Sequence, residues 1–325
     1  MTPYSIAIRT LGTAGEKYIR ELESIKRQTV QPDKVVVYIA EGYDKPAYTI
    51  GIEQYVYVKK GMVAQRALPY TEIHTPLVML LDDDVELAPD SAQKMIDALE
   101  KHNLDCIAAD TFQNHKMSLG QKVYAAMTNL VFPHHSDTWA FKVHGTGSFS
   151  YNNNPTKDVY LSQSAAGPAS LWRKETLLAI HLEHEMWLER FGFAYGDDAV
   201  IFNKLYKNGY NLGIHYNSGI LNLDAKTSSG NYQSNLMRFY TRSKATTLIW
   251  YRTCYHLPGN SAALRAWLLM CYAVKAICLI PIHLIASIKM HSHRVIANYA
   301  RGIIDAVKTI RSTEFKQLPN YIINR

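Results

Sequence analysis

The chain from Ser5 to Ala109 alternates between short apolar segments and amphipathic segments, and this alternation constrains the fold more than any other feature of the sequence. The apolar segments are rich in β-branched residues and predict strands. The amphipathic segments carry apolar side chains at helical spacing, such as Tyr18, Leu22 and Ile25, and predict helices. In chain order we expect strand Ser5–Thr10, helix Glu16–Gln28, strand Lys34–Ile39, helix Gly61–Tyr70, strand Pro76–Leu81, helix Ser91–His102 and strand Asp105–Ala109. Strands that alternate with helices through short links predict an open, mostly parallel α/β sheet flanked by helices.

Three adjacent aspartates follow the third of these strands, in the stretch LVMLLDDDVEL at residues 77–87. Ligands bind open α/β sheets beyond the carboxyl ends of their strands, so we expect Asp82, Asp83 and Asp84 to lie at a binding site. Neighbouring carboxylates repel one another. A divalent cation such as Mn²⁺ or Mg²⁺ would neutralise them, because such ions prefer hard oxygen ligands and bridge proteins to phosphate oxygens. Taken alone, the triplet also fits a solvated acidic turn.

Two further charged clusters stand before and after the aspartates. KKGMVAQR, residues 59–66, places two lysines and Arg66 around the start of a predicted helix, which suits a diphosphate; a solvated helix end is the alternative. YGDD, residues 195–198, places Asp197 and Asp198 where a helix over Asp198–Asn208 is expected to begin. A carboxylate held there could act as a general base, and N-terminal capping of the helix is the alternative.

The chain changes character after about Thr241. Leu264–Ile288 is dense in apolar residues but is interrupted by Lys275, His283 and Pro281, whereas a clean membrane span needs about 20 apolar residues. On a helical wheel, one side gathers the basic residues Arg265, Lys275, His283, Lys289 and Arg294. This pattern favours a helix that lies in a membrane interface, and the basic stretch Lys289–Arg311 could meet anionic lipid. A buried helix packed on the rest of the protein is the alternative.

Charge and cysteine usage narrow the class of partner and the compartment. The net charge is +7 and the pI about 9.0, without zinc-finger spacing or an arginine-rich arm, so we expect no nucleic-acid partner and favour a membrane surface or a phosphorylated ligand. The four cysteines form neither a C-x-x-C pair nor a disulfide framework, which indicates a reducing cytosol. The N-terminus has no secretory signal pattern. Together these features predict a cytoplasmic protein that is peripheral at the inner face of the cell membrane.

The clusters occur in an order that resembles the family-2 glycosyltransferases, which have the GT-A nucleotide-sugar fold. The resemblance covers about Tyr4 to Asp224. The matching stretches are SIAIRT, ESIKRQT with Ser24, Gln28 and Thr29, YIAEGY with Glu41, GMVAQR with Gly61 and Arg66, LLDDDVELAP with Pro89, GPASLWR at Gly167–Arg173, and GDDAVIF with Asp197 and Asp198.

The resemblance implies an inverting, metal-dependent transfer of a sugar from a nucleotide-sugar donor, most simply a UDP-sugar, with Mn²⁺ or Mg²⁺ as cofactor. Asp84 would ligate the metal, and Asp82 and Asp83 would hold the ribose and the donor sugar. Asp198 would take the proton from the acceptor hydroxyl. The remaining assignments are Thr10, Glu41 and Arg66 at the nucleotide, and Gly167, Trp172 and Asp197 at the acceptor.

The sequence departs from the family pattern beyond its last strand. Many members carry a histidine there as a further metal ligand, whereas this chain reads GILNLDAKTSS, with Asn222 and Asp224 in the neighbourhood. Asp224 could replace that histidine with an oxygen ligand. The second departure is Glu41, where an aspartate is usual.

The resemblance also divides the chain. We expect a catalytic domain over 1–240, with a nucleotide-binding half 1–113 and an acceptor-binding half 114–240, and a helical, basic and apolar extension over 241–325. In the second half we expect loops and short strands over Asn114–Ser164, a helix over Glu175–Glu189, and strands Tyr210–Ile214 and Gly219–Leu223. The aromatic residues of this half could stack on a sugar or form a local core: Trp139, Phe141, Tyr151 and Tyr160. His181 and His184 favour a surface helix over a zinc site.

The leading hypothesis is a glycosyltransferase that acts on a glycan or lipid-linked acceptor, in the synthesis of a surface polysaccharide. A nucleotidyltransferase of similar fold is the second, although LGTAGEK only faintly matches the phosphate loop that it needs. The third is a GT-A protein without activity that binds at a membrane surface.

Overall fold

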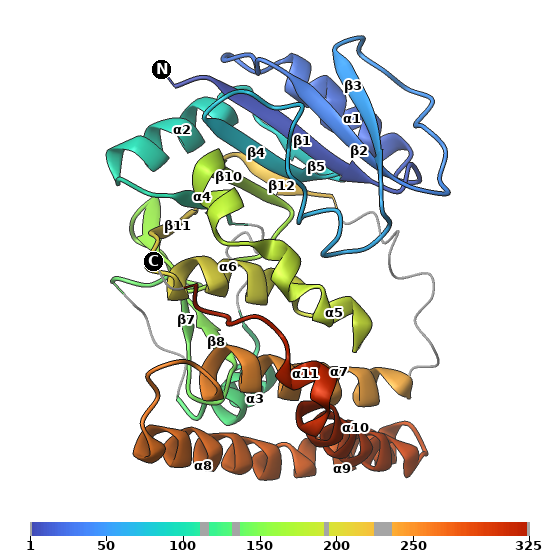
Figure 1. The fold of residues 1–325 in the computed structure, drawn as a ribbon, viewed down its shortest axis with the longest axis vertical. Coiled ribbons are helices and arrows are strands. Elements are labelled where there is room, and N and C mark those ends of the chain that lie inside the picture. The colour runs from blue at the N-terminus through green and yellow to red at the C-terminus, as the bar shows by residue number, and fades with distance from the viewer. Residues whose placement is uncertain (1, 111–116, 132–136, 192–194, 224–235, 324–325) are drawn as a thin grey trace.

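The computed structural model describes residues 2–110, 117–131, 137–191, 195–223 and 236–323. Its centre is an eight-stranded sheet in the order β3-β2-β1-β4-β10-β6-β11-β9 (Figure 1). The strands are β1 (Tyr4–Thr10), β2 (Val35–Ala40), β3 (Glu53–Val58), β4 (Leu77–Asp82), β6 (Cys106–Ala109), β9 (Val159–Leu161), β10 (Ala169–Arg173) and β11 (Leu212–His215). The first four strands of the sheet run parallel, as do β6 and β11, while β10 runs antiparallel to both β4 and β6. The prediction of a mostly parallel α/β sheet is confirmed.

Helices cover both faces of this sheet, and the alternation of side chains along β1 shows how. Ile6 and Ile8 point into a core shared with α1 (Glu16–Lys26) and α2 (Ser91–Lys101). Ala7, between them, points into a second core that includes α6 (Asp197–Lys207). A strand that is buried on both faces has no polar side, which is why these segments are nearly continuous in apolar residues.

Three expectations for individual elements are wrong. Residues 61–67 form turns, not a helix, and Pro69, which cannot continue a helix, follows them closely. The backbone N–H groups of Val63 and Ala64 donate to the Glu189 carboxylate. The helix expected over Glu175–Glu189 is divided, because His181 has a φ of 49°, a value that interrupts an α-helix. Its pieces are α4 (Lys174–Ala179), a 3₁₀ turn (Leu182–Glu185) and α5 (Trp187–Arg190). Residues 119–129 form a helix, α3 (Leu119–Asn129), where loops and short strands were expected.

Two small antiparallel sheets complete the part of the chain that precedes the C-terminal helices: β5 (Val85–Leu87) with β12 (Ile220–Asn222), and β7 (Phe141–Val143) with β8 (Phe149–Tyr151). Of the four aromatic residues considered for sugar stacking, Phe141 and Tyr160 are buried in the core around α6. The local-core alternative therefore holds for these two.

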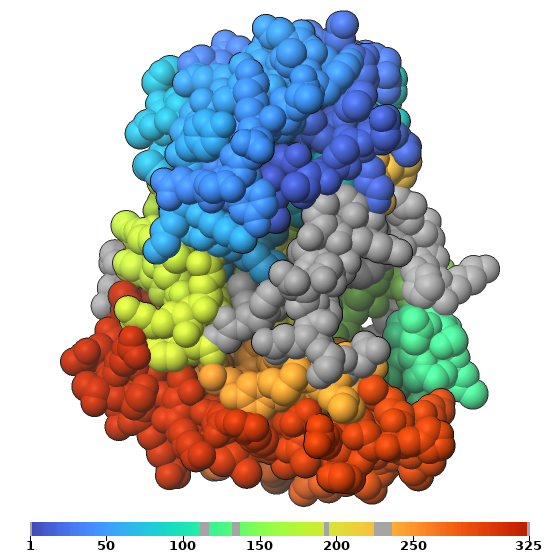
Figure 2. Space-filling model, turned by 90° about the vertical axis from the view of Figure 1, so that its right-hand side faces the viewer, coloured from blue at the N-terminus to red at the C-terminus, as the bar shows by residue number. Residues whose placement is uncertain are grey.

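The C-terminal residues form a helical layer on the side of the molecule away from β3 and α1 (Figure 1). Its elements are α7 (Met237–Trp250), a π-helical turn (Tyr251–Tyr255), α8 (Ala262–Cys278), α9 (Ile280–Lys289), α10 (Arg294–Arg311) and α11 (Thr313–Lys316). Seen from the side, the N-terminal elements form one end of the molecule and this layer forms the other (Figure 2). α10 packs along α7, and Gly302 allows the close approach, since a Cβ there would overlap Ser243 and the Tyr240 carbonyl.

This layer is tied to the first part of the chain by buried polar contacts. Tyr321 donates to the Val200 carbonyl of α6 at 2.7 Å. The buried Glu185 carboxylate pairs with Lys204 of α6 at 2.8 Å and with Arg252 of the π-helical turn at 3.2 Å. Burial tends to raise the pKa of Glu185, but the two cations prevail and lower it. A charged group thus joins the two parts in the interior.

Candidate active site

The carboxyl ends of β1 and β4 bring the first two predicted site residues together. The two strands are parallel neighbours with Arg9 opposite Asp82, so Thr10 and Asp83 follow at the same edge. The Thr10 hydroxyl donates to Asp83 Oδ2 at 2.5 Å and accepts the Gly12 N–H at 2.7 Å. Glu41 directly follows β2 at the same edge of the sheet and is exposed.

The three aspartates have different surroundings. Asp82 pairs with the Arg9 guanidinium. Asp83 is buried, and burial raises its pKa to about 6; its neighbours Asp82 and Asp84 add to the rise, whereas Thr10 and Arg9 oppose it. Asp82 and Asp84 are partly exposed on either side of it. The cluster thus presents carboxylate oxygens to solvent next to an acid whose charged form is disfavoured, and a bound cation would relieve that repulsion.

A fourth carboxyl group lies behind the aspartates and was not predicted. Glu21, on the inner face of α1, is fully buried, and among the described residues neither of its carboxylate oxygens has a hydrogen-bond partner. Burial raises its pKa well above the usual range, and Asp83, Asp82 and Asp84 raise it further. Burial and the neighbouring aspartates thus favour the neutral form of Glu21 relative to an exposed glutamate.

The second carboxylate pair meets the GMVAQR stretch. The Arg66 guanidinium contacts both carboxylates that open α6: Nη1 pairs with Asp197, and Nη2 lies 2.5 Å from Asp198 Oδ1. α6 begins at Asp197 after Gly196 and has no side-chain cap, so the capping alternative is wrong. Arg66 was assigned to the nucleotide and Asp197 to the acceptor; both are buried against each other.

Gly167 completes this contact from a third segment. Its backbone N–H donates to Asp198 Oδ2 at 3.1 Å, and a Cβ at this position would overlap the Asp198 carboxylate and crowd Arg66. The next residue, Pro168, accepts the Asp82 N–H at 2.8 Å, because β10 runs antiparallel to β4. One dipeptide therefore touches both the aspartate triplet and the carboxylate pair, which lie far apart in the chain.

Arg9, which was not among the predicted site residues, connects the two acidic groups electrostatically. It pairs with Asp82, and its charge also lowers the pKa of Asp198. Burial is the larger effect on Asp198 and raises its pKa to about 6, with a further rise from Asp82 and an opposing contribution from the Gly167 N–H. The signal was available, since Arg9 is the one charged residue in the apolar strand YSIAIRT. Asp198, at 32% side-chain exposure, is the accessible member of its pair.

Trp172, the third residue assigned to the acceptor, lies elsewhere. Its side chain is 1% exposed, stacks on Phe202 at 5.3 Å between ring centroids and donates to Ser170. It therefore packs β10 against α6 and has no free surface for an acceptor, which corrects the prediction.

The small sheet of β5 and β12 brings a late segment back to the aspartates. Asn222 pairs with Val85, and the Leu223 N–H donates to the Asp84 carbonyl at 2.8 Å. Lys17 of α1 donates to the Leu223 carbonyl at 2.6 Å. Asp224, the residue expected to complete the metal shell, lies outside the described residues.

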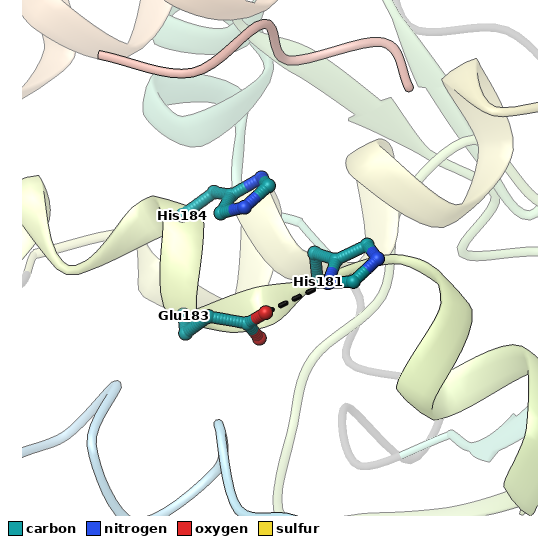
Figure 3. A group of neighbouring side chains, drawn as sticks. All are labelled: His181, Glu183 and His184. Carbon is teal, nitrogen blue, oxygen red and sulfur yellow. Dashed lines mark hydrogen bonds and ion pairs between the residues drawn. The ribbon is translucent and has the colours of Figure 1, made fainter. Parts of the chain in front are cut away.

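The histidines of the divided helix form a separate group (Figure 3). Ligand atoms of His181, Glu183 and His184 lie within 4.8 Å of one another, and the two rings stack at 5.1 Å. His181 and Glu183 are exposed and hydrogen-bond at 2.7 Å, an interaction that holds them together without an ion. This is consistent with the surface position predicted for them.

Comparison with solved structures identifies the fold. GalNAc-T7, solved with UDP, GalNAc and Mn²⁺, matches with a TM-score of 0.50 and 11% identity over 90% of this chain; the match spans 59% of that chain. TarS 1–349 of S. aureus, solved in complex with UDP-GlcNAc, matches with a TM-score of 0.54 and 10% identity over 95% of this chain and 81% of that one. These neighbours are GT-A glycosyltransferases, and the chain has the GT-A fold. No protein-family model and no curated protein matches the sequence.

Proposed function

We propose that the protein is an inverting glycosyltransferase that uses a nucleotide-sugar donor and a divalent cation. The observation that carries the proposal is the meeting of three distant segments at one carboxylate: Asp198 contacts Arg66 and the Gly167 N–H, and Arg9 links it electrostatically to Asp82. A fold alone does not imply a function, but this site supplies both an acidic cluster for a metal and a separate accessible carboxylate.

The donor would bind at the aspartate triplet. Carboxylate oxygens of the partly exposed Asp82 and Asp84 suit Mn²⁺ or Mg²⁺, and when bound such an ion stabilises charge on the leaving diphosphate. Asp84 is the proposed ligand, with Asp82 and Asp83 at the ribose and donor sugar. GalNAc-T7 and TarS were solved with UDP or UDP-GlcNAc, which supports a UDP-sugar as the first donor to test.

Asp198 would be the general base. Its Oδ2 accepts the Gly167 N–H and its Oδ1 faces Arg66, so the carboxylate is held in one orientation. Its raised pKa of about 6 leaves it ionised at neutral pH yet more basic than an ordinary aspartate. It would take the proton of an acceptor hydroxyl as that oxygen bonds to the anomeric carbon and the bond to the diphosphate breaks, with inversion.

The acceptor and the cellular site are further parts of the proposal. The basic and apolar C-terminal helices support work at the cytoplasmic face of a membrane, with a glycan or lipid-linked acceptor of surface polysaccharide synthesis. Reaction type can be tested first. The purified chain is incubated with UDP-, GDP- and dTDP-sugars, with and without Mn²⁺, and released nucleotide is measured.

The outcomes separate the hypotheses. We expect Mn²⁺-dependent release of nucleoside diphosphate from one donor, and its loss in Asp198→Asn. Pyrophosphate release from a nucleoside triphosphate would instead indicate the nucleotidyltransferase. Donor binding without turnover, unaffected by Asp198→Asn, would indicate the inactive binding protein.

A further inference from the structure

The outer face of α8 and α9 is an extended apolar surface. Ala262–Lys289 is 28 residues long and, by length and composition, apolar enough to cross a membrane, but only 17% of its most apolar window is buried in the protein. The exposed side chains recur at helical spacing along both helices, and they include Trp267, Met270, Val274, Ile277, Ile285 and Ile288. Ile277 is 64% and Ile288 73% exposed. Monomeric soluble proteins rarely expose so continuous an apolar surface, which indicates an interaction site.

The opposite face of the same helices carries the polar residues and lies on the protein. Lys275 is buried, and its ammonium group donates to the Thr146 carbonyl at 3.0 Å. The His283 ring stacks on Tyr299 of α10 at 4.0 Å and lies edge-on to Phe239 of α7 at 5.7 Å, both measured between ring centroids. The sequence predicts Lys275 and His283 on a charged face at a membrane surface. The structure corrects this, because both point toward the protein.

The amphipathic pattern is therefore inverted relative to a surface helix of a soluble protein, which turns its apolar side inward. Pro281 lies in the first turn of α9, where the helical segment is divided, and the apolar stripe continues on both sides of this break. The break does not interrupt the stripe. What covers this surface has to be apolar over the whole length of two helices.

Charge identifies the partner. Residues 236–323 contain twelve of the 35 lysines and arginines of the chain but two of its 28 acidic residues, so the positive net charge belongs to this helical layer. Exposed basic residues follow the apolar stripe at Lys289, Arg294, Arg301 and Lys308. A second copy of the chain would bring the same positive charge to the contact, whereas an anionic phospholipid bilayer offers both an apolar interior and negative headgroups.

We propose that α8 and α9 lie flat in the interface of an anionic bilayer, with the stripe from Trp267 to Ile288 embedded between the headgroups and the acyl chains. A crossing orientation would place the face that carries Lys275 and His283 in lipid, although that face is packed on Thr146 and Tyr299. This inference concerns a partner, and it holds or fails independently of the proposed catalytic activity.

Vesicle flotation of the full chain tests the surface. Vesicles of phosphatidylcholine alone are compared with vesicles that also contain phosphatidylglycerol. We expect strong binding to the anionic vesicles, weakened but not abolished by salt, and at least a tenfold loss of binding in Ile277→Glu/Ile285→Glu. The matched control is Ile52→Glu/Leu178→Glu, which adds the same charge at exposed apolar positions of the first part of the chain and should bind as wild type.

Three results would overturn the inference: no binding to either kind of vesicle, equal loss in the control, or conversion of an oligomer to a monomer by the Ile277/Ile285 pair without any vesicle binding. The last result would assign the face to a contact between copies. The melting temperature of each variant shows whether it is folded. Mn²⁺-dependent nucleotide release, measured in parallel without lipid, keeps the two proposals separate.

The depth of tryptophan side chains in the bilayer tests whether α8 and α9 lie flat or cross it. Trp267 is 56% exposed on the stripe, and a second tryptophan is placed by Ile277→Trp, at a position that is 64% exposed, in a Trp267→Phe background. Residue 277 lies near the middle of Ala262–Lys289, so a helix that crosses the bilayer would hold it near the midplane and would hold Trp267 about 15 Å nearer to the surface. Lying flat places both at one depth, so lipids brominated at a given carbon should quench both equally. Unequal quenching that reverses with the bromine position would show a crossing helix.

Discussion

Removal of Arg66 is the sharpest perturbation of the candidate site, because this residue stands between two carboxylates of α6. In Arg66→Met the Asp197 carboxylate, whose side chain is 5% exposed, loses its cationic partner and stays buried. Breaking a buried pair by removing one partner costs about 3–5 kcal/mol, since it leaves an uncompensated charge in the interior. At about 1.4 kcal/mol for each factor of ten, the folding equilibrium should fall by roughly two to four orders of magnitude.

A double-mutant cycle separates this cause from lost packing. Arg66→Met/Asp197→Asn removes the stranded charge as well, so we expect it to recover at least half of the lost free energy of unfolding. The measurement is urea unfolding followed by tryptophan fluorescence. Arg301→Met is the control: this arginine is 70% exposed and pairs with Asp305 at 3.6 Å, and such surface pairs contribute between about 0 and 1 kcal/mol.

Two results would refute the reasoning about Arg66. If Arg66→Met costs no more than Arg301→Met, the guanidinium does not hold a buried charge. If Asp197→Asn fails to restore stability in the Arg66→Met background, the loss arises from packing and not from an unpaired carboxylate.

Three further predictions follow from the same contacts. Because the pKa of Asp198 is raised to about 6, the proposed transfer rate should fall as the pH drops through about 6 and should level off above it. In a pH–rate profile, Asp83→Asn should keep this acidic fall in rate even if it lowers the rate at every pH. A rate that stays constant down to pH 5 would contradict the role of Asp198 as general base. Gly167→Ala should lower the rate at least tenfold, because its Cβ displaces the Asp198 carboxylate, and steady-state nucleotide release measures this. Glu185→Gln should lower the melting temperature strongly in calorimetry, since it leaves two buried cations, whereas Glu314→Gln, at an exposed pair, should leave it nearly unchanged.

The parallel half of the sheet was predicted well because the sequence patterns that indicate its strands and helices are local. Strands such as Val35–Ala40 are apolar on both faces and α1 is amphipathic, so each element can be recognised without its neighbours. The helix expected over Gly61–Tyr70 overlooked a local signal, since Pro69 cannot continue a helix. The contact of the backbone N–H groups of residues 63 and 64 with Glu189, which is distant in the chain, has no local signal.

The candidate site likewise combines local motifs, which could be predicted, with contacts between distant segments, which could not. The aspartate triplet and the pair at Asp197 and Asp198 were found as motifs, but their mutual positions depend on β10, the antiparallel strand that places Gly167 and Pro168 between them. Trp172 was misassigned because its motif lies next to the site, whereas the alternation of β10 turns its side chain into the core. Lys275 was misassigned because a helical wheel shows which residues share a side, not which side meets the protein.

The central claim is that the aspartates after β4 hold a divalent cation that binds the donor's diphosphate. Calorimetric titration of UDP into the protein, with and without Mn²⁺, tests it most directly. We predict that Mn²⁺ strengthens UDP binding at least tenfold in the wild type, that Asp84→Ala loses this dependence, and that Asp90→Ala, an exposed aspartate of the same segment, keeps it. Equal UDP affinity of the wild-type protein with and without Mn²⁺ would contradict the claim.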